Sequence, residues 1–427
     1  HVFKFGGEIR LNHFNSQNVG SAAAGTLKGA LNFGTTAAFT GATAIEDFLT
    51  GVNSSGSLLV GDPQRNISWQ SYAAFLQDDW RLTPRITLNL GLRYELQTPI
   101  WHEVNNLLGN FDPTSATGLV QQSGGALAKS DRNNFGPRAG VSWDITGKGT
   151  TVIRVGGGIY YTSDIAQLVF SAITPHTNPT GAKLFLANGN SINGPGTMNN
   201  GNLAITGSTL TANWKVNTPI FGALPQTGST IQCGNGIAPN PSPCNLGAVD
   251  PTIHGPYVTN WNLAVQHAFT HSLTWEVAYV GNHGTGLYFM RDVNQPTPGV
   301  KNTAANGALE QIRRPHYGSF PYLGQVKWLN NQDHSNFSGL QTTLTTRGWH
   351  GLTYTAAYSL GHALDEASLD GANNPQIIMD SRNTKLEYGN AQYDIRHRFT
   401  FTGSYLIPGY KATPAQLLEG WQLNTSI

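Results

Sequence analysis

The residue types that most often carry chemistry occur in this sequence without the spacing that a catalytic or metal site requires. His267 and His271 have the H-x3-H spacing that holds zinc on a helix, but they flank an expected strand turn, which separates the two rings. The acidic segment from Asp365 to Asp380 lacks the D-x-D-x-D-G pattern of a calcium loop. No G-x-S-x-G elbow is present, and none of the 13 histidines stands in a context typical of a catalytic base. We therefore expect no enzyme, no metal and no cofactor.

Another set of polar residues alternates with apolar ones in strand-like segments, and its charges have both signs. Its members are Lys4, Glu8, Arg10, Arg93, Glu95, Asp144, Arg154, Glu276, Arg396 and Arg398. In RITLNLGLRYEL (85–96) the apolar residues from Ile86 to Tyr94 fall on one face, while Arg93 and Glu95 fall on the other. Such residues belong on the wet face of a sheet, where they pair with one another or hold a neighbouring domain.

The elements that position these residues are predicted to be long paired strands. Four units each contain two alternating runs joined by a very short turn, at residues 65–96, 135–161, 257–284 and 336–364. Three further strands are expected at 1–11, 393–408 and 420–427, which makes about eleven. Long stretches rich in Gly, Asn, Ser, Thr and Pro separate the units, at about 13–64, 97–134, 162–256, 285–335 and 365–392.

This alternation of tight turns with long connections predicts a membrane barrel. Soluble domains rarely contain so many long loops, whereas outer-membrane barrels have short periplasmic turns and long extracellular loops. A tilted membrane strand needs about 9 to 11 residues, which the predicted strands provide. The predicted fold is all-β, with residues 1–427 forming an antiparallel transmembrane portion of a larger β-barrel.

Composition restricts the class of protein in the same direction. Only 11% of the 427 residues are charged, against about 25% in an ordinary soluble domain, and the formal charge is +1. The 50 glycines and the 10% of aromatic residues favour β structure over a helical bundle. No run reaches the ~18 apolar residues of a transmembrane helix. Nucleic acid is not expected as a partner, because binding by counterion release needs a concentrated basic surface.

The aromatic residues are predicted to form two girdles at the membrane surfaces. Trp80, Trp143, Phe269, Trp275 and Trp421 are expected near the periplasmic turns, and Tyr94, Tyr161, Trp261 and Tyr358 near the opposite surface. The alternative is the ordinary preference of aromatic residues for strands. A charge on the lipid face costs about 2 to 4 kcal/mol at midplane, so we expect the charged set above to face the lumen.

Two cysteines, Cys233 and Cys244, lie in the long connection 162–256 and lack the CxxC spacing of a zinc site. We expect a disulfide between them, because the cell surface is oxidising and the bridge would restrict a small loop. Two free thiols are the alternative.

Several segments resemble the Oar-like branch of the TonB-dependent outer-membrane receptors. The resemblance rests on WQSYAAFLQDDWRLTPRITLNLGLRYEL (69–96), NNFGPRAGVSWDITGKGTTVIRVGGGIYY (133–161), YVTNWNLAVQHAF (257–269) and YDIRHRFTFTGSYLIP (393–408). It implies a signal peptide, an immunoglobulin-like accessory domain, a plug and a barrel of about 22 strands. Residues 1–427 resemble only a middle portion of that barrel, without plug or signal peptide, so we expect a fragment of a longer protein.

The resemblance implies a receptor that takes up a bulky substrate across the bacterial outer membrane with energy from a TonB-type protein. Its partners would be membrane lipid, its own plug, the TonB-type protein and an extracellular ligand, for which a glycan or a peptide is our guess. Gly156, Gly157 and Gly158 lie inside one strand, where either contact with the plug or barrel curvature explains them. Two alternatives stay open: a surface adhesion or export component without active import, and a soluble secreted glycan-binding β protein.

Overall fold

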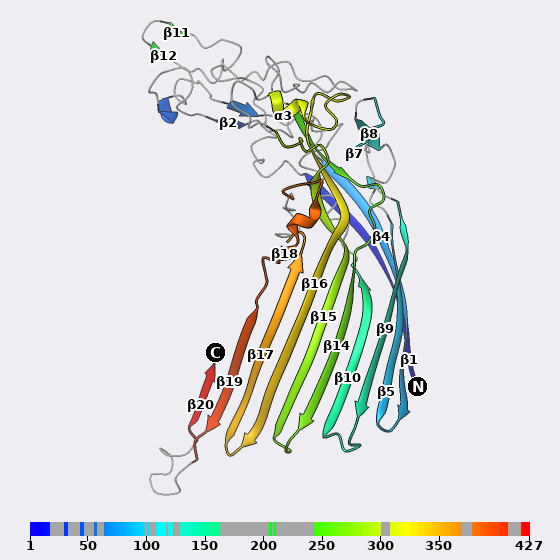
Figure 1. The fold of residues 1–427 in the computed structure, drawn as a ribbon, viewed down its shortest axis with the longest axis vertical. Coiled ribbons are helices and arrows are strands. Elements are labelled where there is room, and N and C mark those ends of the chain that lie inside the picture. The colour runs from blue at the N-terminus through cyan, green and yellow to red at the C-terminus, as the bar shows by residue number, and fades with distance from the viewer. Residues whose placement is uncertain are drawn as a thin grey trace.

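The fold is dominated by one large antiparallel sheet (Figure 1). The computed structural model describes residues 1–17, 30–32, 43–46, 55–57, 64–98, 101–102, 108–116, 118–122, 129–162, 205–206, 209–210, 243–299, 308–368, 378–408 and 420–427. Within these residues, 14 strands belong to the sheet, and eleven of them follow one another along a single path. The prediction of about eleven strands is confirmed.

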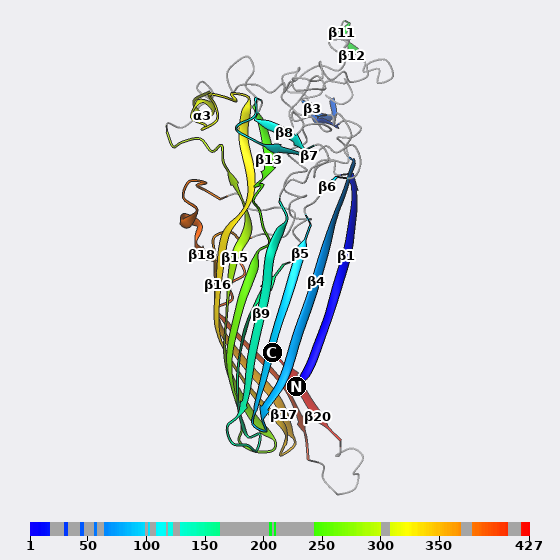
Figure 2. The ribbon, with the colours of Figure 1, turned by 90° about the vertical axis from the view of Figure 1, so that its right-hand side faces the viewer.

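The path through the sheet follows the order of the chain. It runs β1 (Val2–Gln17), β4 (Gln64–Thr83), β5 (Ile86–Gln97), β9 (Asp131–Asp144), β10 (Thr151–Tyr161), β14 (Tyr257–Ala268), β15 (Leu273–Asp292), β16 (Leu323–Trp349), β17 (Leu352–Asp365), β19 (His397–Leu406) and β20 (Gln422–Ser426). Figures 1 and 2 together show that the sheet is strongly curved, with β1 and β20 bending toward the same side. Within the described residues these two edge strands do not pair with each other. An open trough of this kind is the expected shape of a barrel portion.

Tight turns join β4 to β5, β9 to β10, β14 to β15 and β16 to β17 at one end of the sheet, which we call the turn end (Figure 1). Local side-chain chemistry forms them. The Thr83 hydroxyl accepts hydrogen bonds from the main-chain N–H groups of Arg85 and Ile86, at 3.2 and 3.0 Å. Gly348, near the end of β16, and Gly351, in the turn that follows, take φ of 69° and 81°, a conformation that favours glycine. The opposite end of the sheet is the loop end.

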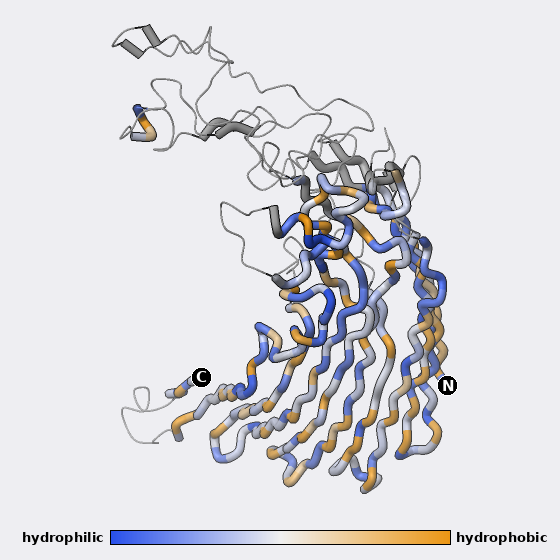
Figure 3. Tube along the Cα trace, turned by 45° about the horizontal axis from the view of Figure 1, so that its top comes forward, coloured by the Kyte–Doolittle hydropathy of each residue, from blue (hydrophilic) through white to orange (hydrophobic). Residues whose placement is uncertain are grey.

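Among the described residues, no second layer of strands or helices covers either face of the sheet between its two ends. One face, the apolar face, carries large hydrophobic side chains that are open to the surroundings, such as Leu263 at 46% and Leu92 at 47% exposure. Hydrophobic and hydrophilic residues alternate along the strands (Figure 3), as a strand requires when its two faces meet different media. A soluble monomer seldom exposes so extended an apolar surface. None of the helices among the described residues is long and apolar enough to span a bilayer.

The buried core lies beyond the sheet proper, at the loop end, in a region that we call the loop-end cap. Five buried side chains form it: Phe111, Ala248, Phe320, Leu323 and Val326. They come from the hairpin of β7 (Leu108–Phe111) and β8 (Leu119–Gln122), from β13 (Cys244–Val249), and from β16 and the chain just before it. β13 pairs parallel to β16, so the cap extends the large sheet.

The cap corrects one predicted boundary. We expect a loop over 285–335, but β15 continues to Asp292 and β16 begins at Leu323, and the two strands stay paired above the tight turn. The short helix α3 (Ala308–Ile312) lies between them in the chain. The strands continue because Tyr288, Phe289 and Met290 are all buried, which covers both faces of β15 there and removes the alternation that marks a strand in the sequence.

The remaining described elements are short. They are β6 (Trp101–His102) and β18 (Gly389–Asn390) on the large sheet, the hairpins β2 (Ala30–Asn32) with β3 (Ser55–Ser57) and β11 (Ile205–Thr206) with β12 (Thr209–Leu210), and the 3-10 helix η3 (Thr384–Glu387).

Candidate functional site

The charged residues expected in the lumen fall on one face of the sheet, opposite the apolar face, which we call the polar face. Directly opposite residues of an antiparallel pair share a face, and the register sets Arg154 opposite Ser142 and Ala264, and Glu276 opposite Gln266. The same register places on the polar face Lys4, Glu8, Arg10, Arg93, Glu95, Asp144, Arg154, Glu276, Arg396 and Arg398.

The polar face of β1, β4 and β5 carries a group of ion pairs. Lys4 Nζ lies 2.6 Å from Asp79 Oδ2. Arg93 Nε lies 2.5 Å from Glu95 Oε1, and its Nη2 lies 3.4 Å from Glu8, which also pairs with Arg10. Exposed pairs of this kind contribute only about 0.2 to 1 kcal/mol each. Together they place a group of fixed charges of both signs on the first three strands of the polar face.

Farther along the sheet, the charged residues make local contacts. Asp144 holds the turn after β9, because its carboxylate accepts hydrogen bonds from the N–H groups of Gly147 at 2.9 Å and Gly149 at 2.8 Å. Arg154 Nη1 donates to Gln266 Oε1 at 2.8 Å. Arg396 Nε lies 3.4 Å from the Asp394 carboxylate.

The aromatic residues expected in girdles lie on the apolar face in two groups. Trp80, Trp143, Trp275 and Trp421 are at or near the turn ends of their strands, while Tyr94, Tyr161, Trp261 and Tyr358 lie farther toward the loop end. Tyr161 and Tyr257 face each other with ring centroids 5.5 Å apart. This arrangement fits two girdles, and the girdle assignment stays a prediction.

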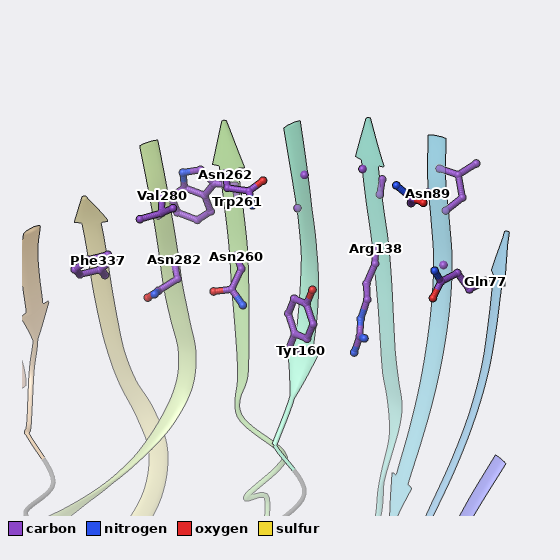
Figure 4. A pocket seen from close by; sticks show the side chains of 17 residues that line it. Gln77, Asn89, Arg138, Tyr160, Asn260, Trp261, Asn262, Val280, Asn282 and Phe337 are labelled. Atoms are coloured by element: carbon purple, nitrogen blue, oxygen red, sulfur yellow. The ribbon is translucent and has the colours of Figure 1, made fainter. Parts of the chain in front are cut away.

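A hollow of about 500 Å³ opens in the middle of the polar face, across the strands from β4 to β16 (Figure 4). Four asparagines line it, which are Asn89, Asn260, Asn262 and Asn282. Within the described part of the chain their side-chain amides form no hydrogen bonds with one another or with other residues. We call this feature the asparagine hollow.

Glycines make the hollow possible. A Cβ at Gly158 would lie 2.9 Å from Arg138 Cγ, and a Cβ at Gly156 would lie 3.0 Å from Asn262 Oδ1. Both glycines belong to the run singled out in the sequence, and each leaves space for a longer polar side chain on the neighbouring strand. The Arg138 guanidinium lies over the Tyr160 ring, 4.2 Å from its centroid. Part of the floor of the hollow is therefore glycine backbone without side chains, and polar and aromatic side chains surround it.

Two other hollows lie on the polar face. The upper hollow, of about 700 Å³, lies toward the loop end and is lined by Tyr288, Asp333 and Asp365, among others. It shares Tyr160 and Asn260 with the asparagine hollow, so the two are continuous. A third hollow, of about 420 Å³, lies on β17, β19 and β20 and is lined mainly by threonines and serines.

The loop-end cap is held by buried polar contacts that sequence patterns do not reveal. The Asn110 side chain donates to the Val249 carbonyl oxygen at 2.8 Å and accepts from the Val249 N–H at 2.9 Å. Asp292 accepts hydrogen bonds from the N–H groups of Asn294 and Val326, both at 2.9 Å, and lies 3.5 Å from Arg314. Because Asn110 and Val249 are far apart in the chain, these contacts fix the cap as one unit. The one local signal in the sequence is the apolar run from Leu287 to Met290.

The remaining residues considered from the sequence are the two cysteines and the possible metal ligands. Cys233 and the side chain of Cys244 lie outside the described residues, so the disulfide stays a prediction. His267 Nδ1 is 2.9 Å from the Thr151 hydroxyl. In the described parts of the chain, no three His, Cys, Asp or Glu side chains are grouped so as to hold a metal ion.

Comparisons with known proteins complete the description. A family model described as outer membrane beta barrel domain matches residues 1–427. No curated protein matches the sequence.

Among solved structures, the alcaligin outer membrane receptor FauA of Bordetella pertussis is 11% identical with a TM-score of 0.38, over 88% of this chain and 40% of that one. The siderophore receptor PiuA of Acinetobacter baumannii is 10% identical with a TM-score of 0.39, over 81% and 32%. The outer membrane transporter YddB of Escherichia coli is 10% identical with a TM-score of 0.39, over 80% and 40%. The chain thus spans less than half the length of these proteins.

Proposed function

Because the chain belongs to the outer membrane beta barrel domain family and lies in the bacterial outer membrane, we propose that it forms part of the wall of a TonB-dependent transporter that takes up a bulky substrate. In this membrane the exposed apolar face contacts lipid, and the polar face lines the interior. The proposal requires a plug and a TonB-type energy-coupling protein as partners. The wall itself binds and guides the substrate and performs no chemical step.

One observation carries the proposal, which is the contrast between the two faces at a single depth. Leu263 and Val265 both lie on the apolar face of β14, where they are 46% and 39% exposed. Asn262, the residue next to Leu263, lies on the polar face and lines the asparagine hollow. Side-chain amides that pair with no other residue are available to bind a polar solute, and a wall with a structural role alone does not require them.

The segments that resemble TonB-dependent receptors support the same assignment, because they form the strands that carry this contrast. The segment 69–96 supplies most of β4 and all but the last residue of β5, and 133–161 supplies most of β9 and all of β10. These four strands contribute part of the group of ion pairs and part of the asparagine hollow. The resemblance and the polar wall therefore concern the same part of the molecule.

Uptake by living cells tests the proposal. Cells that express the complete protein are given a panel of fluorescently labelled hexasaccharides and hexapeptides, with and without the TonB-type protein. We expect at least one probe to accumulate only when both the protein and the energy coupling are present. Accumulation that persists without energy coupling, or failure of every probe to accumulate, would overturn the transporter assignment in favour of an adhesion or export component.

A further inference from the structure

The asparagine hollow has the chemistry of a binding site for an uncharged, hydroxyl-rich solute. We propose that it is a saccharide contact site on the inner wall, which the substrate meets after the upper hollow. This inference rests on the proposed transport function and names the substrate class. It is carried by the unpaired amides, by an aromatic ring that lies over two glycines of the wall and by the position of the charges.

The amides supply the hydrogen bonds that a sugar requires. A carboxamide offers two donors and a carbonyl acceptor and carries no charge, so it matches neighbouring hydroxyl groups that both donate and accept. Asn260 and Asn282 are directly opposite each other on β14 and β15, and Asn262 lies on the same face of β14. None of the three amides is committed to another described residue. A solute in the hollow therefore finds donors and acceptors from two strands side by side.

Phe337 provides a platform at the edge of this amide group. It lies directly opposite Asn282, and a Cβ at Gly339 or Gly361 would lie 3.0 or 3.1 Å from its ring. The outer edge of the ring therefore lies over two glycines of the wall. An aromatic face carries a partial negative charge and attracts the polarised C–H groups of a sugar ring. An aromatic ring beside the two opposite amides can contact both the apolar and the hydroxylated sides of a saccharide.

The position of the charges argues against an ionic substrate at this place. Arg138 is the single charged residue lining the asparagine hollow within the described residues, and the Tyr160 ring covers one side of its guanidinium. One group of ion pairs lies on β1, β4 and β5, where Glu8, Arg93 and Glu95 contact one another. A ligand with several anionic groups would meet one cation among the described lining residues, and a cationic ligand would meet no carboxylate there, whereas a neutral ligand needs no opposite charge.

Size and continuity also suit an oligosaccharide. The hollow of about 500 Å³ falls within the range of about 300 to 1,000 Å³ typical of small-molecule sites. Tyr160 and Asn260 line both this hollow and the upper one, so a chain of sugar units has a continuous surface along the wall. A plug segment that fills the same surface is the competing occupant.

Calorimetric titration of the complete protein in detergent tests the site. The probes are maltohexaose, cellohexaose and the anionic hexagalacturonate. The variant is N260A/N282A, and the matched control is N12A, an asparagine on the polar face of β1 outside the hollow. We expect one of the neutral hexasaccharides to bind, with an affinity about tenfold or more lower in N260A/N282A and unchanged in N12A. Hexagalacturonate should bind at least about tenfold more weakly than the neutral probe.

A second variant, Phe337→Leu, keeps an apolar side chain but removes the platform, and we expect a several-fold loss of affinity. Equal affinity of wild type and N260A/N282A, binding of hexagalacturonate as tight as that of the neutral probes, or no neutral binding below about 10 mM would each overturn the site. Loss of plug protection from protease in N260A/N282A, with sugar affinity unchanged, would assign the hollow to the plug. Energy-dependent uptake that N260A/N282A leaves intact refutes the site alone, whereas sugar binding without energy-dependent uptake refutes the transporter.

Discussion

The assignment of the two faces to lipid and interior predicts opposite effects for the same substitution at adjacent positions of β16. Leu344 lies on the apolar face, directly opposite Trp275 on one side and Ala356 on the other. Because Trp275 belongs to the turn-end group of aromatic residues, we place Leu344 in the turn-end half of the bilayer, between the interface and the midplane. Thr343 is its neighbour on the polar face, directly opposite Glu276.

We expect Leu344→Arg to lower the free energy of unfolding by about 1 to 3 kcal/mol, because an arginine on the lipid face costs about 2 to 4 kcal/mol at midplane and about 0 to 1 kcal/mol near the interface. This corresponds to about a 5-fold to 150-fold change in the unfolding equilibrium. Thr343→Arg places the same side chain at the same depth in the interior, where attraction to Glu276 contributes about 0.2 to 1 kcal/mol. It should leave the stability unchanged or slightly higher.

Urea unfolding of the complete protein in lipid vesicles, followed by tryptophan fluorescence, measures both changes. The loss of the heat-modifiable band on gels gives an independent readout of the folded barrel. If Leu344→Arg is as stable as Thr343→Arg, or if Thr343→Arg is the more damaging of the two, the assignment of the faces is wrong. The comparison does not depend on the identity of the substrate.

Three further predictions concern the loop-end cap and the turns. Asn110→Ala should lower the stability of the cap by about 1 to 3 kcal/mol, because it leaves both polar groups of Val249 unpaired, and should speed hydrogen exchange of the Val249 amide. Burial raises the pKa of Asp333, in the cap portion of β16, from 3.8 to about 7. The folded state then keeps a proton that the unfolded state releases, so stability falls as pH rises from about 4 to about 7, and Asp333→Asn should abolish this slope in urea titrations. Gly351→Ala should lower the melting temperature more than Gly348→Ala, because both have positive φ but a Cβ at Gly351 alone meets a carbonyl oxygen of β19, at 2.8 Å.

Much of the sheet could be predicted because its determinants are local. The alternation in RITLNLGLRYEL places Arg93 and Glu95 on one face whatever the partner strand is, and the structure forms β5 from Ile86 to Gln97. The turns follow from short-range chemistry such as the Thr83 hydroxyl. Their regular spacing then implies strands that pair in chain order, as they do.

The cap and the hollow could not be predicted, because they depend on contacts between distant segments. Nothing near Asn110 in the sequence indicates that its amide bonds to Val249. β13 is only six residues long, and the sequence on either side of it shows no strand-like alternation. Its parallel pairing with β16 therefore leaves no local signal. The row of Asn260, Asn282 and Phe337 in the asparagine hollow exists only when the registers of three strands, β14, β15 and β16, align these residues, which no single segment specifies.

The chain-order path of the sheet also sets the order in which its strands are easiest to assemble. A hairpin such as β4 with β5 closes a turn of a few residues, so its two strands meet at little entropic cost. The step from Tyr161 at the end of β10 to Tyr257 at the start of β14 must close nearly a hundred residues, which costs on the order of 3 kcal/mol more in chain entropy. The sheet therefore divides kinetically into two blocks, β1 to β10 and β14 to β20, and joining them is the slow step expected when the barrel forms.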